Sequence, residues 1–160
     1  MTDLVILTTH LPTIEVEAGA AVVREGERTG SVFVLESGAL SVTRDGVAIA
    51  DITAPGALVG EIAALVGGDH TATVTAVTPA RLRVAYDGGA FLRSSPTVTL
   101  HVAMEVARRL QNLVSYLADL KAQYAGIPGL DMVNDVLSHL ADRQAVALQP
   151  GSEREPDPLY

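Results

Sequence analysis

The sequence predicts a mainly β fold followed by α-helix, and two features of the residue pattern lead to this prediction. Between residues 14 and 86, short runs of alternating apolar and polar residues are separated by turns that contain glycine. From residue 95 onward, apolar residues recur at spacings of three and four, which is the period of an amphipathic helix. Closely spaced strands with glycine-bearing turns are typical of a sandwich, a jelly roll or a barrel.

The expected strands follow one another with little chain between them. Asp45-Gly46 separates two of them and is the strongest short signal for a β-hairpin. Pro55-Gly56 marks a further turn, and the interval 60–70 interrupts the strand pattern. The expected strands cover residues 14–17, 21–23, 31–35, 40–43, 47–50, 71–77 and 80–86.

Two helices are expected after the strands. The first should begin at Ser95-Pro96, because serine is a good N-cap and proline fits the first helical position. It should cover residues 95–125 and end at the glycine and proline residues of 126–129. A shorter amphipathic helix is expected at 130–143, and residues 149–160 have the composition of a disordered tail.

An apolar stripe on the long helix predicts a homodimer. The stripe is a heptad seam over about three heptads, and its members are Ala103, Val106, Leu110, Leu113, Leu117, Leu120 and Tyr124. A second, partial stripe consists of Leu100, Met104, Ala107 and Val114. One face of the helix can lie on the β domain while the other meets a partner helix. The alternative is that the seam packs on the chain's own β domain.

Composition and charge exclude several classes of protein. The net charge is −8 with a single lysine, so autonomous binding to nucleic acid is not expected. No apolar run reaches the roughly 18 residues of a membrane span, and the N-terminus lacks the pattern of a signal peptide. Cysteine is absent, which excludes disulfides and thiolate chemistry. We therefore expect a cytoplasmic protein without a membrane partner.

Enzymatic and metal-binding functions are not expected either. A jelly-roll metalloenzyme needs clustered histidine and glutamate ligands. The histidines are instead far apart on different expected elements, and they are His10, His70, His101 and His139. No arrangement of serine, histidine and aspartate and no carboxylate pair indicates a catalytic site. The sequence predicts a protein that binds a ligand or partner, without a metal or a resident cofactor.

The interruption at 60–70 has the most specific pattern in the sequence. Gly60-Glu61-Ile62-Ala63-Ala64-Leu65 stands between two expected strands, and His70-Thr71-Ala72-Thr73-Val74 leads into the second of them. A glycine followed by a short helical turn presents free backbone N–H groups, which can bind an anion. A carboxylate at the start of this turn can accept hydrogen bonds from a sugar hydroxyl, and a cation about nine residues later could neutralise a phosphate.

These residues resemble the phosphate-binding cassette of cyclic nucleotide-binding domains. Such domains are the sensor modules of catabolite-activator-type regulators, cyclic-nucleotide-dependent kinases and gated channels. The turns at 18–27, the segment 32–46 and Pro55-Gly56 also resemble this family. The resemblance covers roughly residues 14–125, and it implies a β-roll over residues 10–93 that is followed by the long and the short helix.

The resemblance also implies the residues of a ligand site, which are Gly60, Glu61, Ile62, Ala63, His70 and Thr71. Gly60 and Glu61 would face the ribose, while the backbone amides at 62–63 and the hydroxyl of Thr71 would face the cyclic phosphate. His70 stands where nucleotide-binding members usually carry an arginine. Arginine offers a permanent charge and a bidentate fork, whereas histidine offers one donor and a charge that fades above roughly pH 6.5.

Two functions follow from this site. One is a stand-alone sensor that binds cyclic AMP, cyclic GMP or a related anion and signals through its C-terminal helices. The other is a degenerate relative that binds no nucleotide and acts as a dimerising module for an unknown protein partner. Two local alternatives also remain: Glu61 as a solvated carboxylate at a helix start, and His70 as a loop histidine beside Asp69 that contacts no ligand.

Overall fold

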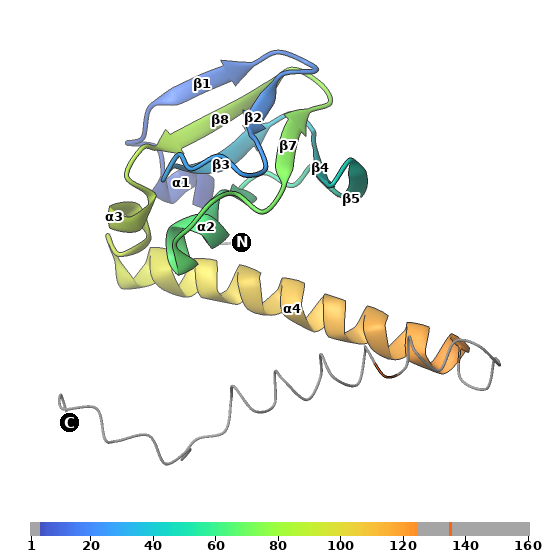
Figure 1. Ribbon diagram of the computed structural model, residues 1–160. Coiled ribbons are helices and arrows are strands. Elements are labelled where there is room, and N and C mark those ends of the chain that lie inside the picture. Colours follow the sequence, from blue (N-terminus) through green and yellow to red (C-terminus); the bar gives the residue numbers. More distant parts are fainter. Residues whose placement is uncertain (1–3, 125–134, 136–160) are drawn as a thin grey trace, which may run out of the picture. The chain divides into compact units, whose positions relative to one another are not determined.

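The computed structural model describes residues 4–124 and residue 135 (Figure 1). The chain divides into two compact units, Met1–Val106 and Ala107–Tyr160. The short helix predicted at 130–143 lies outside the described residues except for Asp135, and the tail predicted at 149–160 lies wholly outside them. No helix in the described part of the chain combines the length and the apolar character that a membrane span requires.

The first unit contains two four-stranded antiparallel sheets. Their strands are β1 (Thr13–Val16), β2 (Ala21–Val23), β3 (Val32–Ser37), β4 (Leu40–Arg44), β5 (Val47–Ile52), β6 (Leu58–Val59), β7 (Thr73–Ala76) and β8 (Ala80–Ala85). One sheet has the order β1-β8-β3-β6, and the other has the order β2-β7-β4-β5. A long helix, α4 (Pro96–Tyr124), follows the strands. The predicted fold class, a β-roll followed by a long helix, is confirmed.

The predicted hairpin at Asp45-Gly46 joins β4 to β5. Arg44 pairs with Val47, so the loop between the two strands has just these two residues. Both have positive φ, 49° for Asp45 and 78° for Gly46. Positive φ at both central residues defines a type I′ turn, whose twist matches the right-handed twist of the strands. The turn therefore fixes the register of β5, which lies at the edge of its sheet.

Strand β3 is buried on both faces because it separates two hydrophobic clusters. Side chains alternate along a strand, so Phe33 and Leu35 enter one cluster while Val32 and Val34 enter the other. The first cluster contains residues of both sheets, and its other buried members are Val23, Leu40, Val59, Val74, Ala76, Ala80, Leu82 and Val84. The second joins the strands to the helices through Leu4, Leu58, Ala85, Phe91, Leu92, Val98 and Val102. Burial on both faces explains the continuous apolar run of β3.

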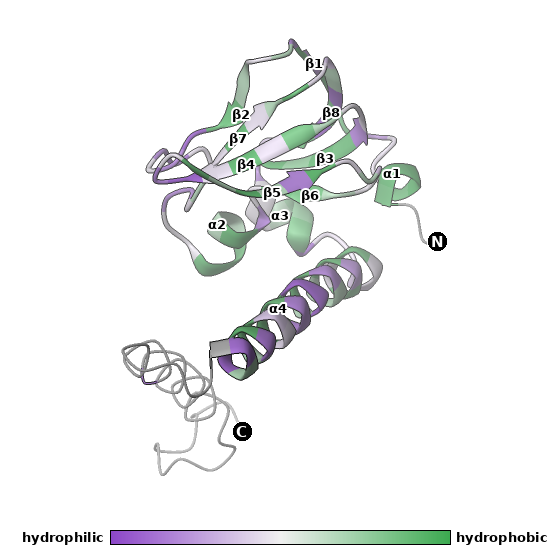
Figure 2. Ribbon diagram, turned by 90° about the vertical axis from the view of Figure 1, so that its right-hand side faces the viewer, coloured by the Kyte–Doolittle hydropathy of each residue, from purple (hydrophilic) through white to green (hydrophobic). Residues whose placement is uncertain are grey.

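Three short helices contribute to this second cluster or border it. They are α1 (Leu4–Leu7), α2 (Glu61–Val66) and α3 (Gly88–Leu92), and Figures 1 and 2 show them on one side of the β-roll with hydrophobic residues in each. The sequence pattern predicts α2 as a helical turn, but it does not predict α1 or α3. Helices this short show too few turns for an apolar period to be recognised.

Helix α4 begins where the sequence predicts. The Ser95 hydroxyl accepts the N–H of Val98 at 3.2 Å, and Pro96 is the first helical residue. Serine satisfies a donor that the first turn leaves free, and proline lacks the N–H that would also be unpaired there. The helix continues to Tyr124, the last residue of this stretch that the structure describes.

The face of α4 that packs on the β-roll differs from both predicted stripes. Val98 and Val102 are buried in the second cluster, and Val106 is half-buried against it. These residues follow one another at a spacing of four, so they share one side of the helix. Leu100 and Met104, from the second predicted stripe, are 62% and 45% exposed. Within the first unit, Val106 is the one residue of the predicted seam that packs on this cluster.

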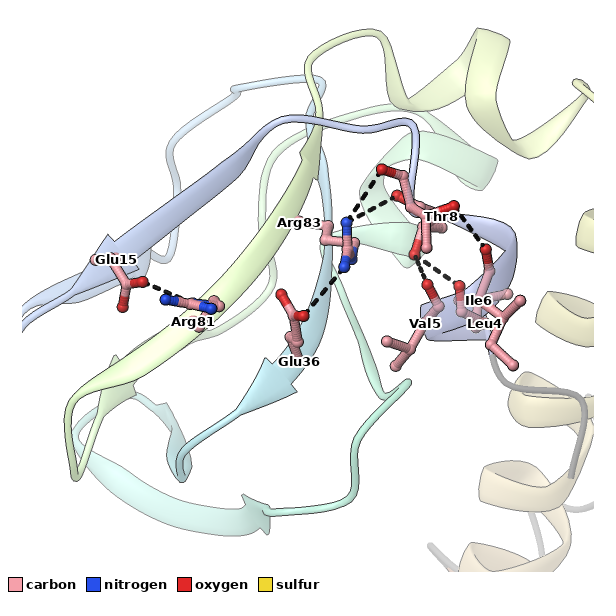
Figure 3. Close-up of polar contacts among 9 residues, drawn as sticks. Leu4, Val5, Ile6, Thr8, Glu15, Glu36, Arg81 and Arg83 are labelled. Atoms are coloured by element: carbon pink, nitrogen blue, oxygen red, sulfur yellow. Dashed lines mark hydrogen bonds and ion pairs between the residues drawn. The ribbon is translucent and has the colours of Figure 1, made fainter.

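An arginine on β8 donates hydrogen bonds to the segment that follows α1 (Figure 3). Arg83 Nη2 donates to Glu36 Oε1 at 3.0 Å, and Nη1 donates to the carbonyl oxygens of Thr9 at 3.3 Å and Thr8 at 3.5 Å. The Thr8 hydroxyl donates to the carbonyl of Leu4 at 2.6 Å. These bonds satisfy carbonyl groups at the end of a helix, where the helix itself supplies no donor.

A second arginine joins β8 to β1 at the surface, also drawn in Figure 3. Arg81 and Glu15 stand opposite each other in the sheet, and Arg81 Nε donates to Glu15 Oε1 at 2.6 Å. This hydrogen bond and the charge of Glu15 raise the pKa of Arg81. Both side chains are more than half exposed, so the pair contributes little to stability.

Candidate functional site

The predicted cassette forms a glycine-led turn and the helix α2 directly after β6. Gly60 is the N-cap residue of α2 and has left-handed backbone angles, with φ 86° and ψ −2°. The N–H groups of Ile62 and Ala63 lie in the first turn of α2, where a helix supplies no acceptor for them. The local backbone thus has the form that the sequence predicts for an anion-binding turn.

Gly60 brings three segments of the chain together. A Cβ atom at this position would lie 2.6 Å from the carbonyl oxygen of Ser31 and 3.4 Å from Cε1 of His70. The first distance is shorter than any contact that a side chain tolerates, and positive φ already disfavours other residues. A glycine is required here because the start of α2 lies directly against Ser31 and against the ring of His70.

Glu61 is the first residue of α2, and it is only 2% exposed. The alternative of a solvated carboxylate is therefore wrong. A carboxylate is favoured in the first turn of a helix by the helix dipole, but burial costs it the hydration that an exposed position would keep. Glu61 therefore belongs to the buried part of the candidate site, at the start of α2.

His70 is buried next to α2, with 5% of the residue exposed. Its ring Nε2 lies 2.8 Å from the hydroxyl oxygen of Thr29. The same hydroxyl accepts the N–H of Ser31 at 3.2 Å. His70 is a loop residue beside Asp69, and its ring is held by the segment that precedes β3.

Backbone hydrogen bonds hold that segment against His70. The N–H of His70 donates to the carbonyl of Glu27 at 2.8 Å, and the N–H of Gly26 donates to the carbonyl of His70 at 2.8 Å. Next to them, Arg28 Nε donates to Asp69 Oδ1 at 3.0 Å. Asp69 is thus paired with Arg28 at the surface. The backbone of His70 is held by two hydrogen bonds, one at its N–H and one at its carbonyl.

The remaining predicted residues lie nearer the surface. Ile62 is 45% exposed, Ala63 is half-buried, and Thr71 is exposed just before β7. The structure brings Gly60, Glu61 and His70 together. It also adds Thr29 and Ser31, which the sequence pattern does not identify, because a polar stretch with glycines indicates a turn without showing what the turn contacts.

The part of the chain that forms this site matches a known family. Residues 13–92 match the cyclic nucleotide-binding domain family. The match covers half of the chain and contains the whole of the cassette. This chain therefore belongs to the cyclic nucleotide-binding domain family.

Solved structures with the same fold include bacterial regulators. The catabolite activator protein of Thermus thermophilus is 25% identical with a TM-score of 0.59, and the similarity covers 77% of this chain and 59% of that chain. The N-terminal domain of a transcriptional regulator from Streptomyces coelicolor A3(2) is 27% identical with a TM-score of 0.51, covering 68% and 81%. A structure described as Sp-2Cl-cAMPS bound to PKAR CBD2 shares the fold, with 24% identity, a TM-score of 0.55 and coverage of 69% and 71%.

Proposed function

We propose that this chain is a regulatory sensor module that binds a cyclic nucleotide, or a related anion, and signals through its C-terminal helices. The observation that carries the proposal is the meeting of Gly60, the buried Glu61 and the buried His70 at the start of α2. Membership of the cyclic nucleotide-binding domain family supports it. So does the similarity in fold to a structure whose description names a bound cyclic AMP analogue.

Each site residue has a role in this proposal. Gly60 and Glu61 face the ribose, and the N–H groups at 62–63 and the Thr71 hydroxyl face the phosphate. His70 supplies the donor that arginine supplies elsewhere in the family.

The route to the helices runs through the second hydrophobic cluster. Ala64 of α2 packs against this cluster, which also contains Val98 and Val102 of α4. A ligand that draws α2 inward would disturb the packing of α4, provided that it binds the two arrangements with different affinity.

Calorimetric titration with cyclic AMP and with cyclic GMP tests the proposal. We expect saturable binding of at least one of them with one site per chain, and much weaker binding of linear AMP, which lacks the cyclic phosphate. A chain that binds neither cyclic nucleotide would not be a sensor of this class.

One observation favours a second function. His70 is buried and already has a hydrogen-bond partner in Thr29, at the position where a nucleotide-binding relative would present arginine. A ring held in this way would suit a degenerate relative that binds no nucleotide and serves as a dimerising module for an unknown protein partner. The same titration separates the two functions, because only the sensor binds a ligand.

The proposal describes a binding protein of the cytoplasm and no catalytic step. The net charge of −8 opposes contact with nucleic acid or with an anionic membrane surface. Among the described residues, no group of three histidine, aspartate or glutamate side chains is placed to hold a metal ion.

The second unit leads to a prediction about assembly. Within it, Leu110 is 45% and Leu113 is 51% exposed, while Leu117 and Leu120 are half-buried. All four belong to the predicted heptad seam, so we propose that α4 pairs with the same helix of a second copy. The double variant Leu113→Asp, Leu117→Asp should change a dimer into a monomer in multi-angle light scattering.

A matched pair of charges on the opposite side of the helix provides the control. Ser115 and Ala122 occupy the heptad position farthest from the seam, so Ser115→Asp with Ala122→Asp should leave the dimer intact. A wild-type chain that is monomeric at high micromolar concentration would rule out this interface.

A further inference from the structure

The Thr29 hydroxyl holds one nitrogen of His70 and leaves the other for a ligand. We infer that Thr29 is a positioning residue of the anion site, which keeps the neutral His70 ring in the form that carries its proton on Nδ1. The inference rests on the proposed function, because it describes how His70 would meet a phosphate without the permanent charge of arginine. Thr29 lies outside the cassette, in the segment that precedes β3.

The inventory of protons favours one direction for the hydrogen bond between Thr29 and His70. A threonine hydroxyl has one proton to donate and can accept two hydrogen bonds. The Thr29 oxygen already accepts the N–H of Ser31 at 3.2 Å and lies 2.8 Å from His70 Nε2. If the hydroxyl donates to Nε2, then its proton has an acceptor within the protein. The reverse direction would leave the hydroxyl proton to solvent, because no other acceptor is found for it among the described residues.

This direction determines where the imidazole carries its proton. In a neutral histidine one ring nitrogen is a donor and the other an acceptor, and the hydrogen bond made by one decides the state of the other. With Nε2 accepting from Thr29, Nδ1 carries the proton. His70 therefore offers an N–H donor to an anion even when it is uncharged. The N–H of Ser31, the hydroxyl of Thr29 and the ring of His70 form a chain of hydrogen bonds, in which each hydrogen bond polarises the next.

The ring of His70 lies against the start of the cassette. The Cε1 atom, which is bonded to both ring nitrogens, lies 3.4 Å from the Cβ position of Gly60. In the described part of the chain, the only fully buried side-chain polar atom without a partner is Arg83 Nε. The Thr29 hydroxyl is the hydrogen-bond partner of the ring in this part of the chain. Nδ1 has no such partner there and is absent from the fully buried atoms, so it is not sealed in the interior.

The charged groups around the ring do not replace its role. They are Glu61 in α2, Glu27 and Arg28 in the preceding segment, and Asp69 beside the ring. Arg28 is paired with Asp69 at 3.0 Å, and Glu27 and Glu61 are acids. An ionised carboxylate only accepts hydrogen bonds, so neither acid can act as the donor to an anion.

The substitution Thr29→Val tests the inference because valine keeps the shape and removes the hydroxyl. The affinity for cyclic AMP or cyclic GMP, whichever the wild type binds, should fall about tenfold, because the ring then has no hydroxyl to hold Nε2 and present Nδ1–H. Thr29→Ser keeps the hydroxyl and should restore wild-type affinity.

Two further measurements distinguish positioning from a structural role. Thr78→Val removes a hydroxyl that accepts the N–H of Ala39 at 3.0 Å elsewhere in the roll, and it should leave affinity unchanged. Ring nitrogen NMR shifts at about pH 8 should show the proton of His70 on Nδ1 in the wild type and a shift toward Nε2–H in Thr29→Val. Unchanged affinity in Thr29→Val, or a wild-type ring with its proton on Nε2, would overturn the inference. If the wild type binds neither nucleotide, the proposed function fails and the claim on affinity fails with it, while the NMR spectrum of the free protein still decides the tautomer.

Discussion

Replacing Leu82 by alanine should lower the free energy of unfolding of the β-roll by about 2–5 kcal/mol. Leu82 is fully buried on β8, within the cluster that contains residues of both sheets. Its strand is paired on both sides, with β1 and with β3. A backbone held on both edges cannot move in to fill the space that the lost side chain leaves, so the cost includes a cavity as well as the lost burial. Urea denaturation at a constant m value measures the loss.

A matched leucine at the surface provides the control for this stability measurement. Leu100 is 62% exposed on α4, so Leu100→Ala should change the free energy of unfolding by no more than about 0.5 kcal/mol. If both variants lose the same small amount, then Leu82 is not in the core that the structure assigns to it.

Most of the β-roll could be predicted from sequence because its local signals agree with its tertiary structure. The hairpin at Asp45-Gly46 needs two residues of positive φ, and this pair is among those that adopt it most readily. The start of α4 at Ser95-Pro96 likewise depends on groups within one helical turn. Each of these features is determined by a few neighbouring residues, so it can be predicted without knowing which distant residues contact it.

Elements that depend on distant contacts were not predicted. Strand β6 has two residues, and it is a strand only because Phe33 and Val34 pair with it. The buried face of α4 shows the same limit. Val98, Val102 and Val106 lie against the roll, although several leucines on other faces are more apolar candidates. The choice of face depends on contacts with residues far away in the sequence, which no period within α4 records.

The candidate site divides in the same way. The turn at Gly60 and the helix after it could be predicted, because a glycine, an acidic residue and a short apolar segment define them locally. The burial of Glu61 and the hydrogen bond between Thr29 and His70 could not, since burial depends on the whole fold and the two residues of the hydrogen bond are 41 positions apart. Resemblance to a family locates the site, but it does not say how a changed residue within it is supported.

Replacing His70 by arginine should strengthen the binding of a cyclic nucleotide roughly tenfold to hundredfold, or by about 1.5–3 kcal/mol. An arginine is charged at every working pH and can hold two phosphate oxygens at once. The hydroxyl of Thr29 could accept one of its five N–H groups in place of the present bond to His70. Parallel titration of the wild type and the variant at about pH 7.5 measures the gain.

The variant His70→Lys separates charge from geometry, because lysine carries the charge without the fork and should give a smaller gain. Binding by the wild type and a further gain with arginine would support the sensor. Binding by the arginine variant alone would support a degenerate relative whose site survives apart from this one residue. If neither binds, Gly60, Glu61 and Thr71 do not form a ribose and phosphate site, since arginine would have supplied the one contact that the cassette lacks.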